Sequence, residues 1–158
     1  NSDKTEVFLQ KKMRACIGSV AIYVPLSHTC QMAARAGIVE AQVALAKIYS
    51  YKPDSEENMQ QALYWARAAA MQQDAEGQFL LADILAMQER QSGGTVDHVT
   101  ERYAWYTIAA EKKELSLFKR LAAKNHAKKL WAEMTEGQRE KAVALAQTYA
   151  AQSFMQAE

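Results

Sequence analysis

The residues of this chain that could bind a metal or transfer protons are few and scattered. Its three histidines, His28, His98 and His126, lie far apart in the sequence. His98 and Glu101 have a spacing that puts two side chains on one face of a helix. A zinc site needs three or four ligands. We therefore expect no metal, and we expect the histidines to cap helices or to be exposed to solvent.

The spacing of the polar residues supports no active site either. Residues 92–94, Ser-Gly-Gly, lack the lysine and the following helix of a phosphate-binding loop, so we interpret them as a flexible turn. No nucleophile can be nominated that has an adjacent base and an orienting acid. The sequence predicts no catalytic residue and no cofactor.

The two cysteines, Cys16 and Cys30, are separated by thirteen residues around an expected turn at 24–26. Antiparallel helices on either side of that turn would bring the two sulfurs within bridging distance. We expect a disulfide, and the alternative is a pair of buried thiols. Redox catalysis is not indicated, because the close Cys-x-x-Cys spacing is absent.

Five basic residues follow one another with no acid between them: Lys119, Arg120, Lys124, Lys128 and Lys129. Arg120, Lys124 and Lys128 form a row at helical spacing, flanked by Phe118 and Trp131. A groove for nucleic acid would use such a row with aromatic residues. A solvated helix face has the same pattern. We prefer the solvated face and expect no nucleic acid, because no basic residues continue the row elsewhere.

Composition indicates one all-α domain. The chain has 158 residues with a net charge of +1, and 29 of its residues are alanine. Alanine and the other abundant residues are strong helix formers, and only two prolines interrupt them. The near-zero net charge excludes a global field that would attract nucleic acid or anionic lipid.

No segment is expected to cross a membrane. The longest uncharged stretch, residues 15–31, has an apolar part that is too short to span a bilayer. Basic residues before the apolar run at 17–24 resemble a secretory signal. An ordinary packed helix explains that run equally well.

An internal repeat is the most informative feature. Residues 33–49 align with residues 69–85 at an offset of 36, and seven of the seventeen positions are identical. A second match relates residues 63–70 to 103–110 at an offset of 40. Each unit is interpreted as two short helices with one apolar stripe each, such as Ala62, Trp65, Ala66 and Ala69. Such units must stack to bury their apolar sides.

Capping signals agree with this register. Asp54 or Ser55 can cap one helix and Asp97 another, while Thr135 and Gln138 have capping-box spacing. We predict helices at about 5–22, 27–36, 38–50, 56–71, 75–89, 98–111, 115–133 and 136–153.

The repeated residues resemble the Sel-one-like repeat family, a relative of the tetratricopeptide repeat. The family pattern AxAQxxLGxxY is similar to residues 39–49 (VEAQVALAKIY) and 75–85 (AEGQFLLADIL). The pattern AxxWYxxAA is similar to residues 62–70 (ALYWARAAA), and it recurs at 105–110 (WYTIAA). The glycine that the family has at the turn from the second helix of one repeat to the first helix of the next is kept as Gly37, and it is replaced by Gln73 and Lys113 in the later turns.

The resemblance implies an α-α superhelix of about eight helices in a single domain over 1–158. It would have an N-terminal hairpin over 1–36, repeats over 37–71 and 75–111, and a capping helix pair over 115–153.

The resemblance also implies a non-catalytic scaffold that binds a protein partner on its concave face, in a bacterial envelope, secretion or signalling assembly. With the expected disulfide, it favours the periplasm or secretion over the cytoplasm. Our candidate contact residues, expected to be exposed, are Gln42, Val43, Gln78 and Phe79. The alternatives are an inhibitor or immunity protein that occludes an enzyme or toxin, and a hydrolase or peptidoglycan or β-lactam binder.

Overall fold

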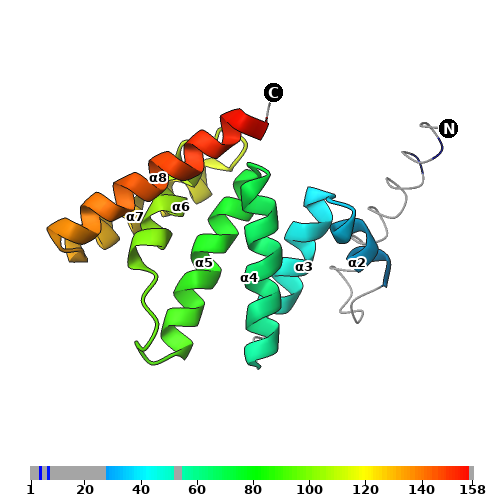
Figure 1. The fold of residues 1–158 in the computed structure, drawn as a ribbon, viewed down its shortest axis with the longest axis horizontal. Coiled ribbons are helices and arrows are strands. Elements are labelled where there is room, and N and C mark those ends of the chain that lie inside the picture. The colour runs from blue at the N-terminus through cyan, green and yellow to red at the C-terminus, as the bar shows by residue number, and fades with distance from the viewer. Residues whose placement is uncertain (1–3, 5–6, 8–27, 52–54, 157–158) are drawn as a thin grey trace. The chain divides into compact units, whose positions relative to one another are not determined.

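The protein is all-α, as predicted. The computed structural model describes residues 4, 7, 28–51 and 55–156, and within these residues it contains seven helices and no strand (Figure 1). The helix expected over 5–22 lies almost entirely outside the described residues, as does the turn expected at 24–26. The chain divides into two compact units, residues 1–69 and 70–158.

The first unit contains α2 (His28–Arg35), α3 (Val39–Tyr51) and most of α4 (Glu56–Met71). The helices α2 and α3 pack against each other. Their buried side chains are mainly small, and they include Cys30, Ala33, Ala34, Ala41, Ala44 and Ala46. Small side chains let two helix axes approach closely, since the distance between packed helices depends on the residues at the contact.

Predicted caps and stripes explain where the helices of this unit begin and end. At the end of α2, Gly37 has a φ of 87°, and its N–H donates to the Ala34 carbonyl at 3.0 Å. At the start of α4, the Ser55 hydroxyl accepts from the Asn58 N–H at 3.1 Å. The predicted α4 stripe of Ala62, Trp65, Ala66 and Ala69 is buried.

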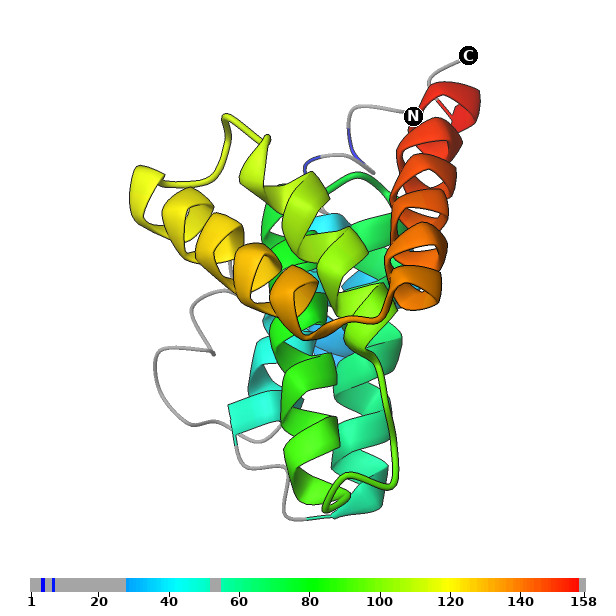
Figure 2. The same cartoon turned by 90° about the vertical axis from the view of Figure 1, so that its left-hand side faces the viewer.

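The second unit contains α5 (Ala75–Gln91), α6 (Val99–Ala110), α7 (Leu117–Glu133) and α8 (Glu136–Gln156). The helix α6 is central, because it packs against each of the other three. Trp105 of α6 is buried and stacks on Tyr149 of α8, with ring centroids 4.2 Å apart. Figure 2 shows α7 and α8 leaving their short connection in diverging directions.

Side-chain caps set the starts of most of these helices. Asp74 caps α5 and accepts from the Gly77 N–H at 2.7 Å. The N-cap of α6 is His98, not the predicted Asp97, and it makes no side-chain cap bond; Asp97, one residue earlier, accepts from the Val99 N–H at 2.9 Å. Ser116 accepts from the Lys119 N–H at 3.2 Å, so α7 begins at Leu117, two residues after the predicted start. The predicted capping box is confirmed: Thr135 N–H donates to Gln138, and Gln138 N–H donates back. Among the described residues, no helix combines the length and the apolar character needed to cross a bilayer.

Candidate protein-binding surface

The predicted contact residues are not the exposed positions that we expected. Gln42 and Gln78 are 5% and 0% exposed, and Val43 is also buried. Phe79 is half-buried and packs edge to face on Tyr106, with ring centroids 6.0 Å apart. The expectation of exposure is therefore wrong for Gln42, Val43 and Gln78, and their side chains belong to the interior.

The physical reason is that both glutamines bind the end of the preceding helix. The Gln42 amide donates to the Ala34 carbonyl at 3.1 Å. The Gln78 amide donates to the Ala70 carbonyl at 3.5 Å and to the Gln73 side-chain oxygen at 3.1 Å. Helix ends leave carbonyls without intrahelical partners. The repeated glutamine gives one such carbonyl in each unit a second donor, beside the backbone N–H of Gly37 or Gln73.

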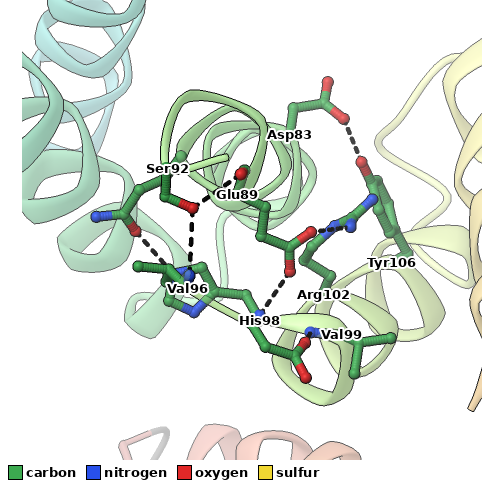
Figure 3. Close-up of polar contacts among 10 residues, drawn as sticks. Asp83, Glu89, Ser92, Val96, His98, Val99, Arg102 and Tyr106 are labelled. Atoms are coloured by element: carbon green, nitrogen blue, oxygen red, sulfur yellow. Dashed lines mark hydrogen bonds and ion pairs between the residues drawn. The ribbon is translucent and has the colours of Figure 1, made fainter. Parts of the chain in front are cut away.

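A polar network ties the α5–α6 connection together (Figure 3). Glu89 of α5 accepts from the His98 backbone N–H at 2.5 Å and forms an ion pair with Arg102 of α6. The His98 ring lies 2.7 Å from the Gln88 side-chain oxygen. The Ser92 hydroxyl donates to the Glu89 carbonyl at 2.9 Å. Residues 92–94, which we expected to be a flexible turn, therefore lead into a loop that is anchored at both ends.

Asp83 and Tyr106 form a second polar contact between α5 and α6, in which the Tyr106 hydroxyl donates to the Asp83 carboxylate at 2.5 Å (Figure 3). Burial raises the pKa of Asp83 above its ordinary value, against the opposing effect of the Tyr106 hydrogen bond. Burial, followed by the nearby Asp83 charge, raises the pKa of Tyr106. His126 stacks on the Tyr106 ring at 4.9 Å. The contact joins two helices and offers no activated nucleophile.

The histidines and the described cysteine form no common site. His28 begins α2, His98 precedes α6 and His126 lies on α7. Within the residues that the structure describes, no three histidine, cysteine, aspartate or glutamate side chains gather as a metal site requires. Cys30 is buried in α2. Cys16 lies outside the described residues, so the Cys16–Cys30 disulfide stays a prediction.

Trp131, near the end of α7, borders two open grooves of the second unit. One groove has a volume of about 590 Å³, and Arg139 and Val143 of α8 form much of its wall. The other groove, about 330 Å³, lies between α6 and α7 and is lined by residues that include Tyr103 and Lys124. The Trp131 ring lies 5.3 Å from the Tyr103 ring and 5.0 Å from the Arg139 guanidinium. These contacts hold the ring in place between the two grooves.

The outer side of α7 exposes large apolar side chains. The exposed fractions are 63% for Leu117, 81% for Phe118, 52% for Leu121 and 36% for Trp131. Leu117, Phe118 and Leu121 form an exposed apolar cluster at the start of α7, which is typical of an interaction surface, and Trp131 lies apart from them near the end of the helix. Of the five basic residues expected on a solvated face, Lys124, Lys128 and Lys129 are exposed, whereas Lys119 and Arg120 are half-buried.

Sequence reasoning missed Trp131 as the residue between the two grooves. The residue stood in the predicted capping helix pair, and it was considered only as a flank of the basic row. Its position between two grooves depends on where α6 and α8 meet α7. A signal was nevertheless present, because Leu117, Phe118 and Leu121 lie off the buried stripe of Ala123, Ala127 and Leu130.

Comparisons with protein-family models, with curated proteins and with solved structures found no match.

Proposed function

We propose that this protein is a non-catalytic scaffold whose second unit binds a protein partner across the two grooves beside Trp131. The exposed tryptophan between the grooves carries the proposal, because tryptophan is among the residues that contribute most to protein–protein binding. Contacts with Tyr103 and Arg139 fix its ring before binding. A pre-positioned anchor costs less conformational entropy when a complex forms.

The wider architecture of the proposal is an α-α superhelix of stacked helix pairs. The repeated glutamine contacts support it, because the same tie between two consecutive helices recurs at an offset of 36 residues. Recurrent helix pairs are typical of repeat proteins that present extended binding surfaces. The binding surface proposed here lies on the terminal helices and not on the glutamine positions.

Photo-crosslinking in the native host tests this function. A photoreactive phenylalanine analogue replaces Val143, which lines the larger groove and is exposed. The control position is Tyr64, an exposed aromatic residue of the first unit. We expect one protein to crosslink at position 143 in near-stoichiometric yield and not at position 64.

A second variant, Trp131→Ala, checks that the groove causes the crosslink. We expect it to reduce the yield at position 143 at least tenfold, because removal of a central aromatic anchor often costs 2 kcal/mol or more, on the order of a thirtyfold loss of affinity. Tyr64→Ala serves as the control and should leave the yield unchanged. Equal crosslinking at both positions, or a yield indifferent to Trp131, contradicts the proposed function.

A further inference from the structure

One straight line of exposed residues runs along the whole of α7. Its members are Leu117, Leu121, Lys124, Lys128 and Trp131, and we call them the outer seam. Their spacing alternates between four and three residues. This alternation is the one by which two helices pack along a common seam. The buried residues Ala123, Ala127 and Leu130 face a different direction, toward the rest of the unit.

The chemistry of the seam is apolar at both ends and cationic in the middle. Leu117 and Leu121 form one end, Trp131 forms the other, and Lys124 and Lys128 lie between them. No acidic residue occurs between positions 115 and 132. Lys119 pairs with Glu76, 2.6 Å away, but that ion pair lies off the seam. Glu111, which follows α6, lines the same groove as Lys124 and Lys128. Neither seam lysine forms an ion pair with it or with another described residue, so the two lysines outnumber the one acidic residue there.

A second copy of the same seam is a poor occupant. Lys124 is the midpoint of the seam, so two copies bring Lys124 against Lys124 whether the helices run parallel or antiparallel. In the parallel arrangement Lys128 also meets Lys128. Like charges set against each other at an interface cost several kcal/mol. The seam therefore disfavours self-association and favours a partner that carries the opposite charge at its centre.

A membrane surface fits less well than a helix. A helix that lies in a bilayer interface inserts one apolar face and keeps its lysines on the polar face. Here Lys124 and Lys128 lie in line with Leu121 and Trp131, so insertion of the apolar residues would carry both ammonium groups toward the acyl chains. Nucleic acid would bind the lysines through phosphates but would leave Leu117 and Leu121 exposed.

We propose that the outer seam binds an amphipathic helix of the partner, with carboxylates opposite Lys124 and Lys128 and apolar side chains opposite Leu121 and Trp131. The inference rests on the proposed function and names the chemistry of the partner. An amphipathic helix that binds in a groove contacts it through apolar side chains spaced three or four residues apart. The grooves on either side of Trp131 give the end of this helix a concave seat.

The probe is a fluorescent helical peptide of the same length as α7. It carries leucine at the positions that face the apolar ends of the outer seam, and glutamate at the positions that face Lys124 and Lys128. A matched peptide carries lysine in place of the glutamates. Binding to the full chain is measured by fluorescence anisotropy. We expect the acidic peptide to bind saturably, and the basic peptide to bind at least tenfold more weakly.

A charge reversal provides the decisive comparison. Lys124→Glu with Lys128→Glu should weaken binding of the acidic peptide at least tenfold and strengthen binding of the basic peptide. The control, Lys113→Glu with Lys141→Glu, makes the same change in net charge at two exposed positions outside α7. It should leave both affinities within about twofold, since separated exposed charges are largely screened at physiological salt.

Several outcomes overturn the inference. One is the absence of saturable binding of the acidic peptide. Another is an equal loss of affinity in the control variant. A third is retention of the full chain by phosphatidylserine vesicles, or by single-stranded DNA, with loss in the seam variant and no peptide binding. A fourth is concentration-dependent dimerisation that Leu121→Ser abolishes. If the peptide fails while position 143 still crosslinks to a protein, the inference is wrong and the proposed function stands.

Discussion

The repeat relates two turns between helices, α2–α3 and α4–α5. Both turns need a residue at a positive φ, but they use different residues there. In the first unit, the turn between α2 and α3 uses Gly37, and Gln42 donates to the Ala34 carbonyl. In the second unit, Gln73 stands at the same position of the repeat with a φ of 65°, and Gln78 donates to the Ala70 carbonyl. Both turns therefore keep a left-handed residue and a buried glutamine.

The difference shows how a side chain compensates for the loss of a glycine. A residue with a Cβ in the left-handed region costs about 1 kcal/mol or more relative to glycine. Gln73 accepts a hydrogen bond from the Gln78 amide at 3.1 Å, a contact that glycine cannot make. That bond is worth on the order of 1 kcal/mol. In the second turn, the hydrogen bond between Gln73 and Gln78 therefore offsets the cost of a non-glycine residue at a positive φ.

Truncation of the buried glutamines should have the largest effect on this comparison. We expect Gln42→Ala and Gln78→Ala each to lower the free energy of unfolding by about 2–3 kcal/mol, because each leaves a cavity and removes a hydrogen bond. Urea unfolding followed by circular dichroism measures the loss. Lys47→Ala, at an exposed position of α3, is the control and should change stability by less than about 0.5 kcal/mol.

A leucine at each position separates packing from hydrogen bonding. The Gln78 side-chain oxygen has no hydrogen-bond partner among the described residues, and its amide contact with Ala70 is the longer of the two. Replacement of an unsatisfied buried polar group by an apolar one can be nearly neutral. Gln78→Leu also removes the hydrogen bond to Gln73, which is worth about 1 kcal/mol, so we expect the two leucine variants to cost the same within about 0.5 kcal/mol. A cost of Gln42→Leu that is larger by about 1 kcal/mol or more would mean that the Gln73 hydrogen bond contributes little.

The next largest effect should come from a side chain at the glycine turn. Gly37→Ala is expected to lower the free energy of unfolding by about 1–2 kcal/mol, the cost of placing a Cβ at a positive φ. An added Cβ would meet no atom within 4 Å, so steric contact contributes nothing. The same unfolding measurement tests this. Gly137→Ala, within α8 and with equally open space, is the control and should stabilise.

The sequence predicted what depends on local signals. Helix boundaries followed from caps that form where they were expected, such as Ser55 and the pair of Thr135 and Gln138. The all-α class followed from composition and from the periodicity of the apolar residues. These signals need only a few neighbouring residues, because a cap binds backbone groups within its own turn.

The direction of the repeated glutamines could not be predicted in the same way. Polarity alone suggested that Gln42 and Gln78 face solvent, and only the preceding helix end provides their buried acceptor. A hint was present in the sequence, because each follows by eight residues an alanine that is itself repeated, Ala34 or Ala70. The surface around Trp131 was even harder to predict from the sequence, since three separate helices create it.

A smaller effect is expected when the second turn receives the residue of the first. Gln73→Gly relieves the positive φ but removes the acceptor of the Gln78 amide. The two contributions are each about 1 kcal/mol and opposite in sign, so we expect a net change below about 0.5 kcal/mol. Thermal and urea unfolding measure it. In the Gln78→Leu background the hydrogen bond is already absent, and the same change should stabilise by about 1 kcal/mol. A clear loss in that background contradicts the compensation.

The smallest effect concerns pH, and it extends the comparison to Asp83. The repeat aligns this residue with Lys47, which is exposed, whereas Asp83 hydrogen-bonds to the buried Tyr106. Burial raises the pKa of Asp83 above the ordinary value of 3.8. The folded state therefore holds this proton more tightly than the unfolded state. Its contribution is fully present below pH 3.8 and is lost as the pH rises through the folded pKa.

Asp83→Asn should remove this dependence, because the amide stays neutral and its oxygen still accepts from Tyr106. We expect the free energy of unfolding of the variant, relative to the natural chain, to increase as the pH rises from about 3 to neutrality. Urea unfolding across that range measures the difference, in which the titration of the other carboxylates cancels. Lys47→Gln, the matched position of the first unit, should show no such trend. A difference that stays constant with pH would mean that the Tyr106 hydrogen bond and the attraction to His126 and Arg102 offset the burial of the charge.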